Sequence, residues 1–308
     1  MFFYKYVLAI DIGGSKMLAS IVDSDGNPAI VFRKEFSSAV SVSSLTEDIL
    51  TTAKKAMDAT KRKAEAIGVT IPGVADTIRG LWHYAPFSGV SNFPIGHILE
   101  EAFHLPVFID NDVNACALGE RMYGCCKDTD DFAWITISNG VGGAIFSSGQ
   151  LIRGFSNGAG EIGHIVVEPD GNLCPCSHRG CLEAHASGRA IAAAYEKMTG
   201  MQSTAKKIAQ LARIGDQAAR QVYNQTGFYL GKAASYIANI VNPEKIVFGG
   251  GVSMDFDLLE GSIRDALDQM AFTTTNQGLK LCKTALDYNA ALIGAATVAQ
   301  TKGGKYIA

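Results

Sequence analysis

One histidine and three cysteines stand close together in the segment HIVVEPDGNLCPCSHRGC, which runs from His164 to Cys181. Imidazole and thiolate are the ligands that zinc prefers, and His164, Cys174, Cys176 and Cys181 supply the four of a closed structural site. Ordinary loop thiols are the alternative, but the remaining cysteines show no such clustering. A disulfide is disfavoured because nothing else indicates an oxidising compartment. We therefore predict a structural zinc site.

Two acidic residues flank this segment. Glu161 precedes His164 and Glu183 follows Cys181, so each carboxylate stands next to the predicted metal ligands in the chain. A metal-braced loop with carboxylates beside it indicates one wall of a binding pocket.

Three turns rich in glycine follow apolar runs, in IDIGGSK, ISNGVGG and VFGGGVS. Glycine lets backbone N–H groups approach phosphate oxygens, and Ser15, Lys16 and Ser138 can add donors. A tight hairpin without a ligand would need glycine too, so each turn alone is ambiguous. Neither the Walker pattern nor the GxGxxG fingerprint is complete, which argues against a P-loop or dinucleotide fold.

A candidate general base lies in the run IDNDVNA, where Asp110, Asn111 and Asp112 follow a short apolar strand. A carboxylate at this place could accept a proton from a hydroxyl group. Asp112 could instead cap the helix that we expect from Val113, because aspartate favours that position. The two interpretations are compatible.

The elements around these residues predict an α/β protein. Residues 6–10, 66–71 and 107–109 read as strands that end at polar or glycine residues, and ligands collect at the carboxyl ends of parallel strands. A capping box at Ser44 and Glu47 starts a helix that we expect over residues 45–65.

From residue 132 the order strand, glycine turn, strand returns, so we expect two similar lobes that face one another across a cleft. Residues 183–198, 204–214 and 218–240 are expected to be helical. The first lobe is predicted to span residues 1–115 and the second, with the zinc loop, residues 116–289. The helix near residues 290–308 is expected to pack back on the first lobe.

Composition limits the functional classes. A net charge of −3 without a basic run gives no reason to expect nucleic acid as a partner. The apolar start MFFYKYVLAI runs into Asp11 without a signal-peptidase site, and no stretch reaches the roughly twenty apolar residues of a membrane span. We therefore expect a soluble cytoplasmic protein without a membrane partner.

Taken together, the GGSK turn, the IDNDVNA run, the AGEIGH block and the CxC, C, Glu block resemble the ROK family of sugar kinases and repressors. The resemblance spans most of the chain. It implies the two-lobed fold of the actin-like ATPases, which is related to ribonuclease H, and an ATP-dependent hexokinase-type activity. It also implies a homodimer.

By this resemblance, Asp112 is the general base that takes the proton from the 6-hydroxyl of a hexose. The positions that hold the sugar would be Asn111, Asp112, Glu161, His164 and Glu183, with Gly73 on the opposite wall. His164 would serve twice, with one ring nitrogen on zinc and the other near the sugar.

The glycine turns match the nucleotide-binding loops of the family. The phosphate-binding positions would be Asp11, Gly13, Gly14, Ser15, Lys16, Ser138, Asn139 and Gly140, and the adenosine loop would be Gly249, Gly250 and Gly251. Mg²⁺ would accompany ATP and be held partly by Asp11. These assignments suit phosphoryl transfer, which mainly requires alignment of the acceptor and neutralisation of charge.

The sequence departs from the family pattern in three places. Ser138 and Asn139 stand where the family usually has Gly-Thr, which leaves the γ-phosphate contact open. Ser177 replaces a glycine, and Phe87 after Pro86 replaces an asparagine of the substrate loop. The last change removes a side-chain amide, so one sugar hydroxyl would be recognised differently and the identity of the sugar is left open.

Three functions remain under comparison. A glucokinase-like enzyme is favoured, with N-acetylmannosamine or N-acetylglucosamine kinase as the alternative. A ROK-type transcriptional regulator would need an added helix-turn-helix ahead of a first strand that here begins within ten residues of Met1. A sugar-binding protein without catalysis is disfavoured by Asp112.

Overall fold

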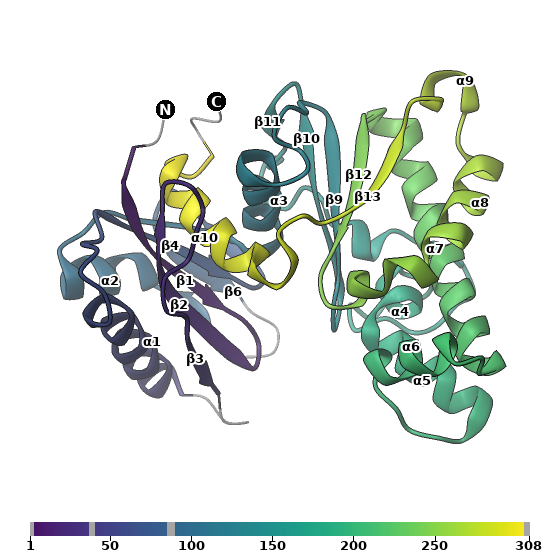
Figure 1. Ribbon diagram of the computed structural model, residues 1–308, viewed down its shortest axis with the longest axis horizontal. Coiled ribbons are helices and arrows are strands. Elements are labelled where there is room, and N and C mark those ends of the chain that lie inside the picture. The colour runs from purple at the N-terminus through teal and green to yellow at the C-terminus, as the bar shows by residue number, and fades with distance from the viewer. Residues whose placement is uncertain (1–2, 37–40, 85–89, 305–308) are drawn as a thin grey trace. The chain divides into compact units, whose positions relative to one another are not determined.

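The computed structural model describes residues 3–36, 41–84 and 90–304 (Figure 1). The chain forms two compact units. Unit 1 comprises Met1–Asp128, Arg153–Gly158 and Tyr288–Ala308, and unit 2 comprises Thr129–Ile152 and Ala159–Asp287. A boundary after residue 115 would cut helix α3 (Asp112–Tyr123), which instead lies wholly in unit 1 because it packs on the C-terminal helix α10 (Ala290–Gln300).

Unit 1 is built on a five-stranded sheet of order β3-β2-β1-β4-β8. Its strands are β1 (Tyr6–Ile12), β2 (Lys16–Asp23), β3 (Phe32–Glu35), β4 (Ala66–Ile71) and β8 (Val107–Asn111). The first three pair antiparallel, whereas β4 and β8 are added parallel to β1. The register pairs Asp11 with Thr70 and Thr70 with Asp110, so polar residues meet at the carboxyl ends of neighbouring strands.

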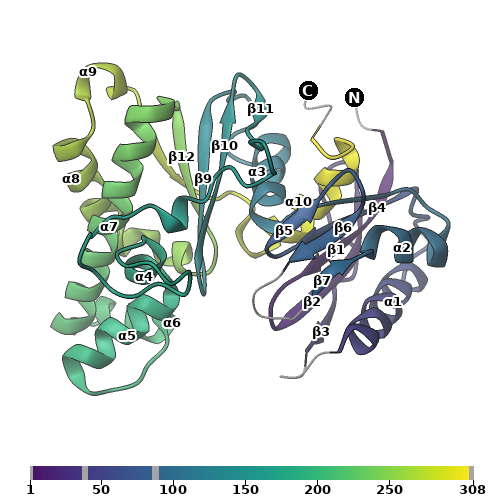
Figure 2. The same ribbon diagram turned by 180° about the vertical axis from the view of Figure 1, so that it is seen from behind.

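Alternating residues of β1 face two separate apolar layers. Leu8 and Ile10 pack in the cluster that contains the inner face of α1 (Val42–Asp58), and α2 (Ile95–Phe103) contributes to the same layer. Val7 and Ala9 point the other way, into a cluster with residues of α10. Figures 1 and 2 show α10, in yellow, beside β1 and β4.

A small sheet completes unit 1. It has the order β5-β6-β7, with β5 (Val74–Asp76), β6 (Leu81–Tyr84) and β7 (Ser91–Phe93). Trp82 is buried and its indole N–H donates to the carbonyl of Pro72 at 2.9 Å. This bond fixes the end of β4 against the small sheet.

Unit 2 repeats the sheet pattern with the order β11-β10-β9-β12-β13. Its strands are β9 (Phe132–Ile137), β10 (Val141–Ser147), β11 (Gln150–Leu151), β12 (Lys245–Gly249) and β13 (Lys280–Lys283). Again three strands pair antiparallel and two are added parallel. The expectation of two units with the same strand pattern is confirmed.

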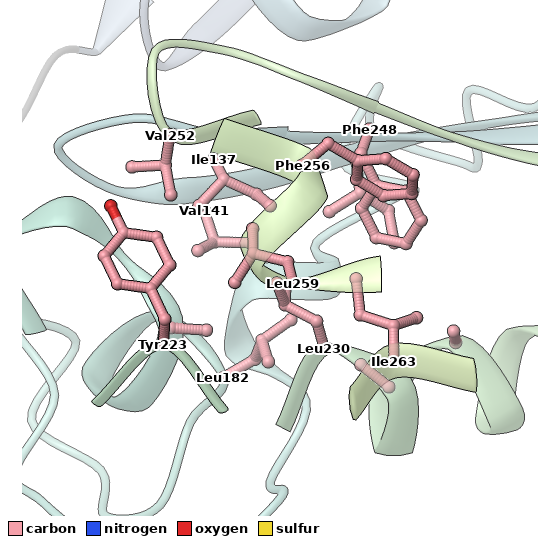
Figure 3. Packing of buried hydrophobic residues seen from close by; sticks show 14 of the residues in the cluster. Ile137, Val141, Leu182, Tyr223, Leu230, Phe248, Val252, Phe256, Leu259 and Ile263 are labelled. Atoms are coloured by element: carbon pink, nitrogen blue, oxygen red, sulfur yellow. The ribbon is translucent and has the colours of Figure 1, made fainter. Parts of the chain in front are cut away.

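Helices of unit 2 cover one side of its sheet. They are α4 (Glu183–Ala186), α5 (Gly188–Thr199), α6 (Ala205–Arg213), α7 (Gln217–Val241), α8 (Glu260–Met270) and α9 (Thr273–Asn276), with 3-10 turns η1 (Ile162–His164) and η2 (Val252–Leu258). A further turn, η3 (Asp287–Asn289), leads to α10. Figure 3 shows Leu230, Leu259 and Ile263 packed with Phe248 and Phe256 in the core of this unit.

Three predicted helices differ from the structure. The C-terminal helix ends at Gln300 and is followed by turns, so it does not continue toward residue 308. The helix expected over residues 45–65 begins at Val42, where Ser41 and Ser44 form the capping box instead of Ser44 and Glu47, and it ends at Asp58 rather than residue 65. The helix expected over residues 183–198 is interrupted at Ser187, whose side chain caps α5 by accepting from the N–H of Ala190. Within the described residues, no helix has the length and apolar character that a bilayer span requires.

Candidate functional site

Asp112 is the first residue of α3, directly after β8. The cap of this helix is Asn111, whose side-chain oxygen accepts from the N–H groups of Val113 and Asn114 at 2.9 and 3.2 Å. The alternative that Asp112 is the cap was therefore wrong by one residue. Asn111 orients the first turn of α3, and with it the carboxyl group of Asp112.

The carboxyl group of Asp112 has an unusual protonation equilibrium. Burial of this carboxyl group raises the pKa of Asp112, and the negative charge of Asp11 raises it further, to about 7. Burial also raises the pKa of Asp11, although the hydroxyl of Thr70 donates to its Oδ1 at 2.8 Å and opposes this effect. The carboxyl group that sequence reasoning assigned to the metal, Asp11, thus raises the pKa of the carboxyl group assigned to the base, Asp112.

Asn111 also connects two predicted sugar-binding positions. Its amide nitrogen donates to the carbonyl of Gly73 at 3.0 Å. Gly73 has a φ of 80°, a conformation that side chains of L-residues rarely adopt, so the turn after β4 requires glycine. The structure thus places Gly73 next to Asn111 rather than on an opposite wall, and sugar binding by either residue stays a prediction.

In unit 2, His164, Cys174, Cys176 and Cys181 place one ligand atom each within 4.8 Å of one another. The sulfur of Cys174 lies 3.8 Å from Nδ1 of His164, and the sulfurs of Cys176 and Cys181 lie 3.6 Å apart. Tetrahedral zinc with Zn–S bonds of about 2.3 Å separates its ligand atoms by roughly 3.5 to 3.8 Å. The four residues fit a zinc ion in number, type and spacing.

His164 presents its second ring nitrogen away from the cysteines. Nε2 lies 4.0 Å from the carboxylate of Glu161, and both side chains are substantially exposed. A histidine whose Nδ1 faces the cysteine sulfurs and whose Nε2 faces an exposed carboxylate can connect a metal site to a polar ligand. Glu161 and His164 are thus neighbours in the structure, and sugar binding by them stays a prediction.

Glu183 follows Cys181 closely in the chain, but its side chain contacts the turn at residues 138–140 and Val141 after it. This turn is the second of the two that we predict to bind phosphate. Oε2 of Glu183 accepts from the N–H of Val141 at 3.0 Å. A side chain on Gly140 would place its Cβ 2.4 Å from the same oxygen, so any larger residue there would require the Glu183 carboxylate to shift. Glu183 therefore joins the start of α4 to the turn between β9 and β10.

The first phosphate turn, residues 13–16, joins β1 and β2 in unit 1. Gly13 donates its N–H to the carbonyl of Lys16 at 2.8 Å, and this bond closes the hairpin. Gly14 and Ser15 form its tip, and Lys16 begins β2. The hairpin that the sequence predicted is confirmed, and phosphate binding by it stays a prediction.

The third glycine run has partly structural causes. A Cβ on Gly249 would lie 2.1 Å from the ring of Trp134, and one on Gly250 would lie 2.5 Å from the carbonyl of Ile137. Gly251 meets nothing within 4 Å. Packing therefore accounts for two of the three glycines, whereas Gly251 leaves open space at the end of β12.

Sequence reasoning missed three polar residues of these sites. Thr70 binds Asp11, Arg153 binds Asp110, and Arg189 binds the turn at Asn139. Each pair is separated by more than forty positions in the sequence, so no local motif could have found it; strand register could have suggested only the first. The substrate-loop residues Pro86 and Phe87 lie outside the described residues.

Known proteins share this sequence and architecture. A family model described as the ROK family matches residues 7–302. The chain is 32% identical over 311 residues to a glucokinase of Halalkalibacterium halodurans, an alignment that covers 94% of this chain and 93% of that protein. A ROK family glucokinase from Streptomyces griseus, solved with glucose and AMPPNP, superposes with a TM-score of 0.83 at 29% identity and covers 94% of this chain and 98% of its own.

Regulators are also among the relatives. The DNA-binding transcriptional dual regulator NagC of Escherichia coli is 33% identical over 240 residues, which cover 75% of this chain and 59% of the regulator. The match therefore leaves two fifths of that protein without a counterpart here. On the family model and the full-length match to a glucokinase, the chain belongs to the ROK family and has the two-lobed actin-like ATPase fold of its sugar kinases.

Proposed function

We propose that the protein transfers the γ-phosphoryl group of ATP to the 6-hydroxyl of an aldohexose, glucose or a close relative. The observation that carries the proposal is the carboxyl group of Asp112, held at the start of α3 by the Asn111 cap, with a pKa of about 7. A base whose pKa is near neutral pH accepts a proton from an alcohol most effectively. The full-length similarity to a glucokinase supports the choice of reaction.

In the proposed reaction, the oxygen of the sugar 6-hydroxyl forms a bond to the γ-phosphorus of ATP. Asp112 accepts the proton that this hydroxyl loses. The bond between that phosphorus and the β–γ bridging oxygen breaks, and ADP leaves. Because the transition state is mainly stabilised by alignment and charge neutralisation, an oriented carboxylate suffices as the protein's chemical group. Asn111 orients it and holds Gly73 through the 3.0 Å hydrogen bond.

The remaining assignments follow the two units separately. In unit 1 we propose that Asn111 and Gly73 contact sugar hydroxyls and that residues 13–16 contact phosphate. In unit 2 we propose that Glu161, His164 and Glu183 contact sugar hydroxyls, and that the turns at residues 138–140 and 249–251 contact the nucleotide. The exposed Nε2 of His164 and its neighbour Glu161 are suitable polar groups for this purpose.

Two metal ions belong to the proposal. Mg²⁺ bound with ATP would be held by Asp11. Burial raises the pKa of Asp11, and a bound cation would offset this effect. The cation would neutralise phosphate charge during the transfer. Zn²⁺ would be held by the four residues of the cysteine cluster and would stabilise the loop that carries His164.

A sugar-responsive regulator is the second candidate, because NagC matches the chain at 33% identity. Such a protein would bind a sugar without turning it over. N-acetylmannosamine and N-acetylglucosamine remain alternative kinase substrates. Release of ADP measured with glucose, mannose, fructose, allose and the two N-acetylhexosamines distinguishes these possibilities, and turnover of none of them would favour the regulator.

The decisive variant is Asp112→Asn. We expect it to lower turnover by about a hundred- to ten-thousandfold, the usual contribution of a general base, while calorimetry still detects sugar binding. Asp25→Asn, at an exposed turn after β2, is the control and should leave turnover unchanged. Near-normal turnover by Asp112→Asn would reject the proposed base.

A further inference from the structure

Arg189, the second residue of α5, reaches the second phosphate turn, residues 138–140. Its Nε donates to the carbonyl of Asn139 at 2.8 Å. Its Nη2 lies 3.6 Å from Oε1 of Glu183, the carboxylate whose other oxygen accepts from Val141. One guanidinium group thus contacts the turn and the carboxylate packed beside it.

Helix α5 begins at this turn as well. Gly188 donates its N–H to the carbonyl of Ser138 at 2.7 Å, and Ser187 caps the helix. The positive end of a helix of twelve residues therefore lies against residues 138–140. The turn is fixed to α5 by backbone and side chain together.

Charge at the turn is otherwise unfavourable for an anion. The Glu183 carboxylate is largely buried, with 15% of its side chain exposed, and it contacts the backbone at Gly140 and Val141. A negative charge so close to a phosphate-binding turn repels phosphate unless a cation offsets it. Arg189 is placed to provide that cation.

The side chain of Arg189 is 64% exposed, so it remains accessible to a ligand. A guanidinium group has five N–H donors, and the contacts to Asn139 and Glu183 use only part of them. Because the side chain of Arg189 is exposed and the two charged groups are 3.6 Å apart, the ion pair with Glu183 contributes little stability. The planar donor arrangement of arginine suits phosphate oxygens better than a lone ammonium group does.

We infer that Arg189 binds the β- and γ-phosphates of the nucleotide at residues 138–140. The family usually has Gly-Thr where this chain has Ser138-Asn139, and Arg189 supplies the hydrogen-bond donor to the γ-phosphate that this change leaves open. The inference rests on the proposed kinase function and adds a phosphate-binding residue to it.

Calorimetric titration with ATP, ADP and AMP, each in the presence of Mg²⁺, tests the inference on the full chain. We expect Arg189→Gln to weaken ATP and ADP binding by about ten- to a hundredfold, the effect of losing hydrogen bonds to a charged group, and AMP binding much less. Arg189→Lys should recover part of the affinity. Lys197→Gln removes an exposed charge at the other end of α5 and should bind all three nucleotides as the wild type does.

Thermal unfolding of each variant verifies that it is folded. Equal ATP affinity of wild type and Arg189→Gln would overturn the inference alone. An equal loss of affinity for AMP would also overturn it, because Arg189 would then hold the turn in place without binding the β- and γ-phosphates. Failure of the wild type to bind ATP would overturn the kinase proposal together with it.

Discussion

Arg153 and Asp110 form a bidentate ion pair in unit 1, with Nη1 3.0 Å from Oδ1 and Nη2 2.6 Å from Oδ2. Asp110 is only 1% exposed and also accepts from the backbone N–H of Asn111. Arg153 donates further to the carbonyl of Gly303. The pair therefore ties β8 and the start of α3 to the segment after α10, directly beside the proposed base.

We predict that Arg153→Met lowers the free energy of unfolding by about 3–5 kcal/mol, because it leaves a buried carboxylate without its partner. Urea denaturation measures this loss. Arg264→Met is the matched control, since Arg264 pairs with Glu260 on the exposed surface of α8 and its removal should lose about 0.3–0.5 kcal/mol. Similar losses in the two variants would contradict the role of burial.

Much of the architecture could be predicted because it is encoded locally. The two glycine hairpins and the strands after them follow from apolar runs and turn residues, and the repeat of this pattern predicted two similar sheets. The helix break at Ser187 was missed, because the residues on both sides favour a helix and only the cap at Ala190 reveals the new start.

The candidate site could be predicted only where its residues are neighbours in the chain. The cysteine cluster and the Asn111-Asp112 pair were found from spacing, and the cluster is present in the structure. Arg153 and Arg189 reach their partners across tertiary contacts. An arginine in a polar segment resembles any solvated arginine, so its role depends on packing that the sequence does not display.

The pKa of Asp112 predicts the pH dependence of catalysis. Because the base must be unprotonated and its pKa is about 7, kcat/KM should rise with pH and level off above that value. Below it, the rate should fall by about tenfold for each pH unit. Initial rates at constant ionic strength measure the profile, and Asp25→Asn should show the same midpoint. A midpoint below about pH 5 would contradict the raised pKa.

The same shift predicts an effect on stability. In the folded protein Asp112 keeps its proton until about pH 7, whereas in the unfolded chain it loses the proton near about pH 3.9. The folded state thus binds more protons between these values, so this group lowers the free energy of unfolding as pH rises through that window.

Asp112→Asn removes this penalty. We expect the variant to gain stability relative to the wild type as pH rises from 5 to 8, by an amount on the order of 1 kcal/mol or more in the absence of ligands. Urea denaturation at the two pH values gives the comparison. A difference between the proteins that does not change with pH would show that Asp112 titrates normally.

Removal of the metal tests the cysteine cluster. Elemental analysis of protein never exposed to chelator should find about one zinc per chain, and a strong chelator should lower the melting temperature because the loop around residues 164–181 loses its cross-link. Cys176→Ala should abolish zinc binding. Cys282→Ala changes a thiol in β13, outside the cluster, and should retain the metal. If elemental analysis finds no zinc in wild-type protein that was never exposed to chelator, the site is disproved.

Gly68 determines how closely α10 approaches β4. A Cβ at this position would lie 1.8 Å from the carbonyl oxygen of Ala295, a backbone atom that cannot move without shifting the helix. We predict that Gly68→Ala lowers the free energy of unfolding by about 1–3 kcal/mol or more, as overpacked cores do. Gly261→Ala is the opposite case, because Gly261 lies in α8 with open space around it. Alanine there should stabilise the helix by up to about 1 kcal/mol. If Gly68→Ala and Gly261→Ala changed the free energy of unfolding in the same direction, the packing of α10 on β4 would not limit the residue at position 68.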